Sequence, residues 1–265
     1  EFDSMAQYHD AAVVVIGRSG SESVDLPTEY LSFTQEERNL IQMATERFDK
    51  VILLLNVTNP INMTELSQYD IDAVLWVGAL GQEGAYAIGE ALNGTVNPSG
   101  HLVDTWAVDA AAAPAAANLG NYTITNSDVV SGNKYIVYAE GVYVGYRYYE
   151  TRYEDAVLAQ GNAGDFDYDA QVVYPFGYGL SYTDFSWSDY KMTETADGFA
   201  LNVTVTNTGK AAGKEVVQAY LQNPYTEYDR TNRIEKPAVE LVGFAKTDIL
   251  QPGESQTVKI DVDKS

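Results

Sequence analysis

Three long apolar runs in the first half of the chain predict β-strands. They are residues 11–16 (AAVVVI), 51–56 (VILLLN) and 73–77 (AVLWV). Continuous runs of this kind, rich in branched residues, are typical of parallel strands that are covered on both faces. Helical spacing follows the first and third runs, and an alternation of strand and helix predicts a parallel α/β sheet.

Two amphipathic segments accompany these strands. Thr34 and Glu37 have the spacing of a capping box, which predicts the start of a helix. A second helix is expected between Gly81 and Gly94, because glycine commonly ends a helix. The first helix should present one apolar face, made of Leu40, Ile41, Ala44 and Phe48.

The pattern changes near Thr183. From residue 184 onward, short segments alternate apolar and polar residues, and turns such as 207–209 (NTG) and 252–253 (PG) separate them. This alternation is typical of an antiparallel β-sandwich. The sequence therefore predicts two domains, an α/β domain over residues 1–183 and an all-β domain over residues 184–265.

The charge balance narrows the classes of partner. The 265 residues include 16 basic and 38 acidic side chains, for a formal net charge of −22. Such a surface repels phosphate backbones and anionic lipids, so neither nucleic acid nor a membrane surface is expected as a partner. A neutral substrate such as a sugar is unaffected by this field. The chain has no cysteine, which excludes disulfides and thiolate catalysis.

Several motifs together resemble glycoside hydrolase family 3, typified by β-glucosidases and β-xylosidases. In chain order they are VVVIGRSGSESVD, LLLNVTNP, AVLWVGALGQEGAYAIGEALNGTVNPSGHLVDTW, EGVYVGYRYYE, YPFGYGLSYTDF and LNVTVTNTGKAAGKEVVQAYL. The resemblance covers nearly the whole chain. It implies a three-layer α/β sandwich with a parallel sheet, followed by a fibronectin type III-like sandwich.

The family pattern extends beyond this chain in three respects. Its α/β domain has further elements ahead of AAVVVIGR, and its fibronectin-like domain continues beyond VKIDVDKS. We therefore expect both domains to be incomplete here. The family's (β/α)8 barrel, which holds the sugar and supplies an aspartate nucleophile, has no candidate motif in the chain. The resemblance thus implies that such a barrel, placed before or after this region, is a partner.

The same resemblance assigns a catalytic role to Glu22. The stretch GRSGSESVD aligns with the family pattern Gly-Arg-x-x-Gly-Glu-Gly-x-Asp, which places Glu22 at the general acid/base. Retaining glycosidases need a second carboxyl group about 5–5.5 Å from the nucleophile. A loop after a strand suits this task, since ligands bind at the carboxyl ends of parallel strands. Ser21 and Ser23 replace glycines of the pattern.

Three neighbours of Glu22 are the candidate substrate-binding residues, namely Arg18, Ser21 and Asp25. Arg18 and Asp25 either orient Glu22 and line the leaving-group side, or form an ion pair that braces the loop. For Ser21, hydrogen bonding within the loop is the alternative to substrate contact.

Other acidic and aromatic residues have structural interpretations. We expect Glu83 to lie in the first turn of its helix, where the helix dipole favours an acid. Tyr143, Tyr146, Tyr148 and Tyr149 are expected to pack at a domain interface, with stacking on sugars as the alternative.

No metal or organic cofactor is expected. Three aspartates alternate over residues 165–169, but an EF-hand needs Gly at the sixth and Glu at the twelfth position, where Ala170 and Phe176 stand. His9 and His101 have no metal-binding spacing. Glycoside hydrolysis by two carboxyl groups requires neither kind of cofactor.

The resemblance thus implies part of a retaining, exo-acting β-glucosidase that is inactive without its barrel. Two alternatives stay open. One is a non-catalytic accessory or scaffold module, and the other is the same enzyme class acting on β-xylosides or α-arabinofuranosides.

Overall fold

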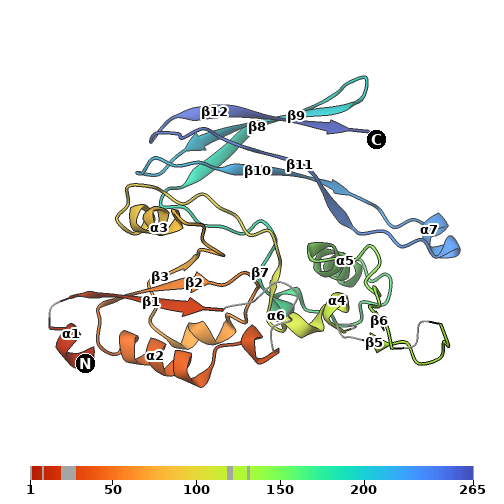
Figure 1. Cartoon of the computed structure of the whole chain (residues 1–265). Helices are drawn as coiled ribbons and strands as arrows, with labels where there is room; N and C mark the ends of the chain where they lie inside the picture. The colour runs from red at the N-terminus through yellow and green to blue at the C-terminus, as the bar shows by residue number, and fades with distance from the viewer. Residues whose placement is uncertain (1, 8, 19–27, 118–121, 130–131, 265) are drawn as a thin grey trace. The chain divides into compact units, whose positions relative to one another are not determined.

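The computed structural model describes most of the chain and divides it into two compact units (Figure 1). The described residues are 2–7, 9–18, 28–117, 122–129 and 132–264. The first unit comprises Glu1–Val96, Trp106–Ala110 and Ala170–Tyr174, and the second comprises Asn97–Thr105, Ala111–Asp169 and Pro175–Ser265.

The first unit is built on a three-stranded parallel sheet. Its strands are β1 (Ala11–Gly17), β2 (Lys50–Asn56) and β3 (Ala73–Trp76), in the order β1-β2-β3. Val14 pairs with Leu53, and Leu54 pairs with Leu75. The three apolar runs therefore form the parallel strands that the sequence predicted.

Helix α2 (Gln35–Thr45) lies along one face of this sheet and contacts β1 and β2 (Figure 1). The predicted capping box is present, because the Thr34 hydroxyl accepts from the Glu37 amide and the Glu37 carboxylate accepts from the Thr34 amide. The apolar face of the helix buries Ile41 and Ala44, which are 1% and 0% exposed. The sequence prediction for this helix is confirmed.

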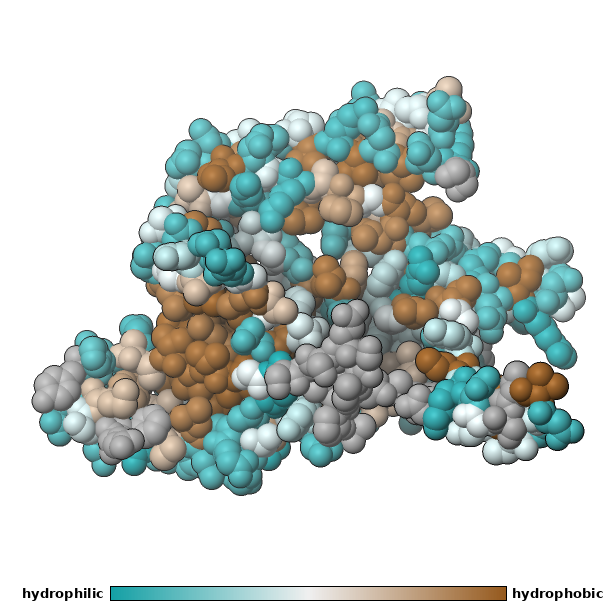
Figure 2. Space-filling view, in the orientation of Figure 1, coloured by the Kyte–Doolittle hydropathy of each residue, from teal (hydrophilic) through white to brown (hydrophobic). Residues whose placement is uncertain are grey.

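Coverage of the parallel strands differs from the prediction. Leu53 and Leu54 of β2 are both buried, as expected for a strand covered on both faces. On the edge strand β1, however, Val13 and Val15 are 47% and 56% exposed, whereas Ile16 is 1% exposed. Figure 2 shows hydrophobic surface in the region of this sheet. The expected coverage of both faces is thus wrong for β1, because α2 shields one face.

Helix α3 (Gly84–Leu92) follows β3 and ends two residues before Gly94, whose φ of +78° favours glycine. The expectation for Glu83 is wrong. This residue is the N-cap itself, not part of the first turn, and its side chain makes no capping hydrogen bond. A glutamate is a poor cap because its longer side chain does not reach back to the amides as readily as Ser, Thr, Asp or Asn does.

Short elements complete the first unit. Strands β4 (Trp106–Ala107) and β7 (Val172–Tyr174) pair antiparallel. The Trp106 ring lies 5.8 Å from the Trp76 ring and 6.4 Å from the Tyr174 ring, which joins this pair of strands to β3. The remaining helices of the unit are α1 (Phe2–Met5), η1 (Thr28–Leu31) and η2 (Thr64–Gln68).

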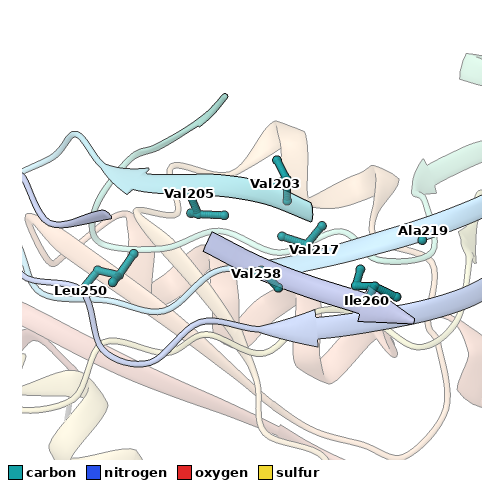
Figure 3. Close-up of a cluster of buried hydrophobic side chains, with 7 residues drawn as sticks. All are labelled: Val203, Val205, Val217, Ala219, Leu250, Val258 and Ile260. Carbon is teal, nitrogen blue, oxygen red and sulfur yellow. The ribbon is translucent and has the colours of Figure 1, made fainter. Parts of the chain in front are cut away.

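Two antiparallel sheets form the core of the second unit, which also contains the short antiparallel pair of β5 (Tyr122–Thr123) and β6 (Lys134–Tyr135). One has the order β12-β9-β8 and consists of β8 (Phe185–Glu194), β9 (Gly198–Asn207) and β12 (Ser255–Asp263). The other pairs β10 (Val216–Gln222) with β11 (Val239–Lys246). The two sheets share one apolar core (Figure 3), formed by Val203, Val205, Val217, Ala219, Leu250, Val258 and Ile260. The strands predicted from period-two alternation are confirmed.

Helix α5 (Tyr146–Val157) packs on β11 in the same unit. The Tyr146 hydroxyl accepts from the Leu241 amide at 2.8 Å, and the Thr151 hydroxyl accepts from the Ala238 amide at 2.9 Å. The other short elements, two of which span the division between the units, are η3 (Ala110–Ala112), α4 (Pro114–Ala117), β5 (Tyr122–Thr123), β6 (Lys134–Tyr135), α6 (Tyr168–Gln171) and α7 (Glu227–Asn232). No helix among the described residues is both long and apolar enough to span a membrane.

Candidate active site

The carboxyl ends of the three parallel strands are tied together at one edge of the sheet. The Arg18 amide donates to the Asn56 carbonyl at 3.2 Å, one residue beyond the end of β1. The Asn56 side-chain amide donates to the Gly78 carbonyl at 2.5 Å, and the Trp76 indole donates to the Val57 carbonyl at 2.6 Å. This is the edge of a parallel sheet at which ligands bind.

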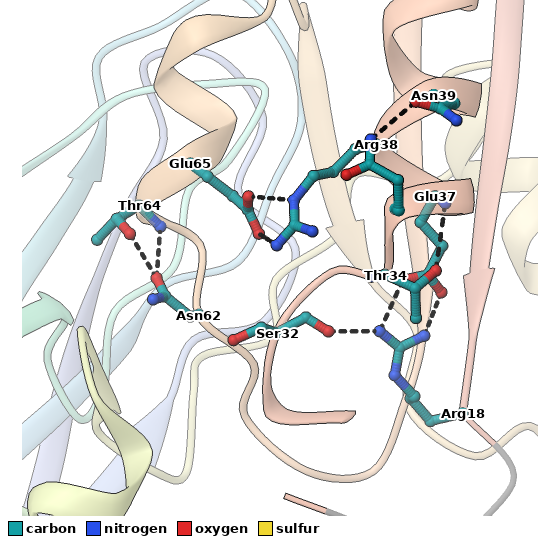
Figure 4. Close-up of polar contacts among 10 residues, drawn as sticks. Arg18, Ser32, Thr34, Glu37, Arg38, Asn39, Asn62, Thr64 and Glu65 are labelled. Atoms are coloured by element: carbon teal, nitrogen blue, oxygen red, sulfur yellow. Dashed lines mark hydrogen bonds and ion pairs between the residues drawn. The ribbon is translucent and has the colours of Figure 1, made fainter. Parts of the chain in front are cut away.

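Arg18 is held in place by several groups at this edge (Figure 4). Its guanidinium forms a two-pronged ion pair with the Glu37 carboxylate, one prong of which measures 2.8 Å. It also donates to the Tyr30 carbonyl at 3.2 Å and to the Ser32 carbonyl at 3.0 Å. The side chain of Arg18 is only 4% exposed. The last described residue before Glu22 is therefore held by several partners at once.

Glu37 serves the helix and the arginine at once. Burial raises the pKa of its carboxyl group, but the hydrogen bonds from Arg18 and Thr34 lower it by more, so the pKa lies below its ordinary value of 4.5. Glu37 is therefore ionised at neutral pH. Its negative charge in the first turn of α2 also interacts favourably with the helix dipole.

A second ion pair braces the same region (Figure 4). Arg38 donates to the two carboxylate oxygens of Glu65 at 2.6 and 3.1 Å, which links α2 to η2. In the turn that leads into η2, the Asn62 side-chain oxygen accepts from the Thr64 amide at 2.9 Å. Arg18 thus connects the end of β1 to α2, and Arg38 connects α2 to η2.

The other sequence-predicted site residues, Ser21, Glu22 and Asp25, lie outside the described residues. Their roles, like the substrate contact of Arg18, stay predictions. The contacts of Arg18 favour the bracing alternative, with a partner that the sequence did not suggest. Nothing in the sequence pairs Arg18 with Glu37, because the two are 19 residues apart and the capping box already accounts for Glu37.

The tyrosine cluster packs inside the second unit. The Tyr146 ring lies 4.6 Å from the Phe176 ring and 6.1 Å from the Tyr220 ring. Tyr149 is 3% exposed. Burial raises the pKa of Tyr143, whose hydroxyl accepts from the Lys236 amide. Packing of α5 against β10 and β11 therefore accounts for Tyr146, and burial within the second unit accounts for Tyr149.

His101 is engaged in a structural contact. Its Nδ1 donates to the Gly177 carbonyl at 2.7 Å, and its Nε2 lies 3.4 Å from the Glu215 carboxylate. The hydrogen bond with Glu215 raises the pKa of His101. Within the described part of the chain, no cluster of three or more His, Asp or Glu side chains is arranged to hold a metal ion.

Comparison with known proteins identifies the family. Residues 1–146 match the glycosyl hydrolase family 3 C-terminal domain, and residues 215–265 match the fibronectin type III-like domain. The chain belongs to glycoside hydrolase family 3. Its membership explains why the apolar strands, the GRSGSE stretch and the C-terminal antiparallel strands occur together in this order.

Relatives within family 3 are named as β-glucosidases. The chain is 35% identical to a β-glucosidase of Ruminococcus albus over 97% of its own length and 24% of that protein. It is 39% identical to β-glucosidase A of Butyrivibrio fibrisolvens, over 86% of the chain and 26% of that protein. The chain thus spans about a quarter of the length of these relatives.

A solved structure within family 3 has the same fold. It is β-glucosidase 3B of Thermotoga neapolitana in complex with α-D-glucose, which is 32% identical and superposes with a TM-score of 0.80. The match covers 99% of this chain and 33% of that one.

Proposed function

We propose that this chain is the part of a retaining, exo-acting β-glucosidase that supplies the general acid/base, and that Glu22 is that residue. The observation that carries the proposal is the fixed position of Arg18 at the carboxyl end of β1, four residues before Glu22. Names of relatives and the glucose complex of the Thermotoga enzyme support a terminal β-D-glucosyl residue as substrate.

In this proposal, the reaction has two steps. In the first, the Glu22 carboxyl donates its proton to the glycosidic oxygen while an aspartate attacks the anomeric carbon, and the bond to the leaving group breaks. In the second, the Glu22 carboxylate takes a proton from water, whose oxygen attacks the anomeric carbon and displaces the aspartate. The sugar leaves with its configuration retained, and both residues return to their starting states.

The aspartate comes from a separate (β/α)8 barrel. This chain spans 24% of the length of the Ruminococcus relative, so the rest of that relative leaves room for a barrel. In the same proposal, residues 1–183 form the family's α/β sandwich and residues 184–265 its fibronectin-like sandwich. Arg18 anchors the Glu22 loop, whereas Ser21 and Asp25 contact the sugar.

The test compares the chain alone with the chain combined with the barrel. Folding of each variant is checked by circular dichroism, and hydrolysis is measured with phenyl β-glucoside and with 2,4-dinitrophenyl β-glucoside. Only the combined protein should be active. Glu22→Ala should lower the rate on the phenyl glucoside by about 10²–10⁴-fold. The same variant should slow the first step less with the dinitrophenyl glucoside, because dinitrophenolate can leave without receiving a proton.

Azide gives a second readout, since it attacks the glycosyl-enzyme without a general base. It should restore turnover of Glu22→Ala and yield the β-glucosyl azide. Glu29→Ala, which changes an exposed glutamate near the same loop, is the matched control and should keep full activity. Equal loss on both substrates without azide rescue would reject Glu22 as the acid/base. If the chain combined with the barrel hydrolyses neither glucoside, the accessory-module alternative is favoured. If it releases the aryl group faster from aryl β-xylosides than from aryl β-glucosides, the substrate is a β-xyloside.

A further inference from the structure

A groove of about 690 Å³ lies beside α5 in the second unit. Its volume falls within the range of about 300–1,000 Å³ that is usual for small-molecule sites. One wall is α5, and the other is the segment that leads into α6. The lining residues used below are Glu150, Tyr153, Phe166, Asp167, Tyr168 and Asp169.

A carboxyl–phenol pair belongs to the lining of this groove. The Tyr168 hydroxyl donates to the Glu150 carboxylate at 2.6 Å. Burial raises the pKa of Glu150, and burial together with Glu150 raises the pKa of Tyr168. The two side chains therefore hold each other in place across the groove, and the phenol keeps its proton at neutral pH.

Aromatic rings supply apolar surface next to this pair. Tyr153 is 50% exposed, and its ring meets the Tyr168 ring edge to face at 5.3 Å. The Arg152 guanidinium lies over the Phe166 ring, 5.8 Å from the ring centre. A half-exposed ring whose orientation is set by a neighbour is a preformed stacking platform.

We propose that this groove binds a neutral oligosaccharide, a short β-linked glucan chain, and this proposal rests on the β-glucosidase function proposed above. Glu150, Asp167 and Asp169 line the groove, and carboxylate oxygens can accept hydrogen bonds from sugar hydroxyls. Within the described part of the chain, the side chains that line the groove include three acids and no base, so their charge repels an anionic ligand. The apolar faces of pyranose rings match the Tyr153 ring.

The described residues that line the groove lie between Glu150 and Pro175 in the chain and belong to the second unit. In our two proposals, this groove holds a glucan chain, whereas Glu22 acts on the bond that is cut. Binding there raises the local concentration of chain ends near the enzyme.

The test is isothermal titration of cellotetraose into the full 265-residue chain. Tyr153→Ala should weaken binding by about tenfold or more, because it removes the stacking platform. Tyr153→Phe keeps the ring and should bind within about twofold of the parent chain. Tyr228→Ala, which changes an exposed tyrosine on α7, is the matched control and should bind as the parent chain does.

Three results would overturn the proposal. They are no detectable binding of cellotetraose, binding that Tyr153→Ala leaves unchanged, and equal binding of an oligogalacturonate, which the carboxylates should repel. The experiment does not depend on hydrolysis. Glu22→Ala should bind cellotetraose as the parent chain does, so a failure of the groove and a failure of the acid/base assignment give different outcomes.

Discussion

The guanidinium of Arg18 and the carboxylate of Glu37 form a buried, two-pronged ion pair that joins the end of β1 to the first turn of α2. The same carboxylate accepts the Thr34 amide that begins the helix. One side chain thus caps a helix and fixes the residue from which the candidate catalytic loop departs. Removing the charge of Glu37 should therefore weaken both the helix cap and the anchoring of Arg18.

Glu37→Gln is expected to destabilise the first unit by about 2–3 kcal/mol, because it leaves the Arg18 charge buried without its partner. Urea unfolding followed by tryptophan fluorescence measures this, since Trp76 and the buried Trp106 report on that unit. Glu36→Gln is the control. Glu36 is an exposed neighbour in the same turn, and its change should cost less than about 0.5 kcal/mol. Equal losses of stability in Glu37→Gln and Glu36→Gln would contradict a stabilising ion pair between Glu37 and Arg18.

The pair His101–Glu215 should make the stability of the second unit depend on pH. The pKa of His101 is raised above its ordinary value of 6.5. The stability that it contributes is therefore fully present below pH 6.5 and is lost as the pH rises through the folded-state pKa. The measurement is the free energy of unfolding between pH 5.5 and about 8.5.

Glu215→Gln is the matched variant for this prediction. Glutamine keeps the size and one hydrogen-bonding oxygen but removes the charge that raises the pKa of His101. The pH dependence in that range should become smaller. If it stays as steep as in the parent chain, another group is responsible for it.

Some of these features could be predicted from the sequence, and others depend on contacts between distant residues. The capping box is a four-residue pattern, so Thr34 and Glu37 were identified correctly. The exposure of Val15 was missed because a run of apolar residues gives no sign that its strand lies at an edge. The partner of Arg18 and the groove beside α5 were missed for a related reason, since each depends on how separate elements fold against one another.

A buried amide at the end of β9 provides a third prediction. Asn207 is 0% exposed, and its oxygen accepts from the Thr183 hydroxyl at 2.7 Å. Its nitrogen donates to the carbonyls of Ala211 and Leu250, both at 2.8 Å. Asn207→Ala leaves these groups unpaired and should destabilise the second unit by about 3 kcal/mol.

Hydrogen exchange of β9 and β12 amides checks this prediction, because those strands are paired along their length. Thr208→Ala, at the exposed neighbouring position, should leave the exchange unchanged. Gly209→Ala should behave like Asn207→Ala, since an added Cβ would lie 2.2 Å from the Thr183 hydroxyl. Faster exchange in the Thr208 variant alone would contradict the role of the amide.

Burial in the parallel sheet predicts unequal effects of two similar truncations. Leu53→Ala removes a side chain with 0% exposure and should cost about 2–5 kcal/mol. Val15→Ala changes a residue that is 56% exposed on the adjacent strand, and it should cost less than about 1 kcal/mol. Chemical unfolding monitored by tryptophan fluorescence compares the two. A large cost at Val15 would mean that its exposed face is covered in solution.

Arg18→Lys tests whether the anchor of the loop matters for catalysis. Lysine keeps the charge but cannot reproduce the two-pronged pair with Glu37 together with bonds to the Tyr30 and Ser32 carbonyls. If the anchor positions Glu22, kcat for phenyl β-glucoside in the protein combined with its barrel should fall by about 10–100-fold. KM should change little, because the positioned group acts on the bond being broken. Azide should then rescue Arg18→Lys only weakly, since Glu22 is still present, whereas a rise in KM with unchanged kcat would instead assign Arg18 to substrate binding.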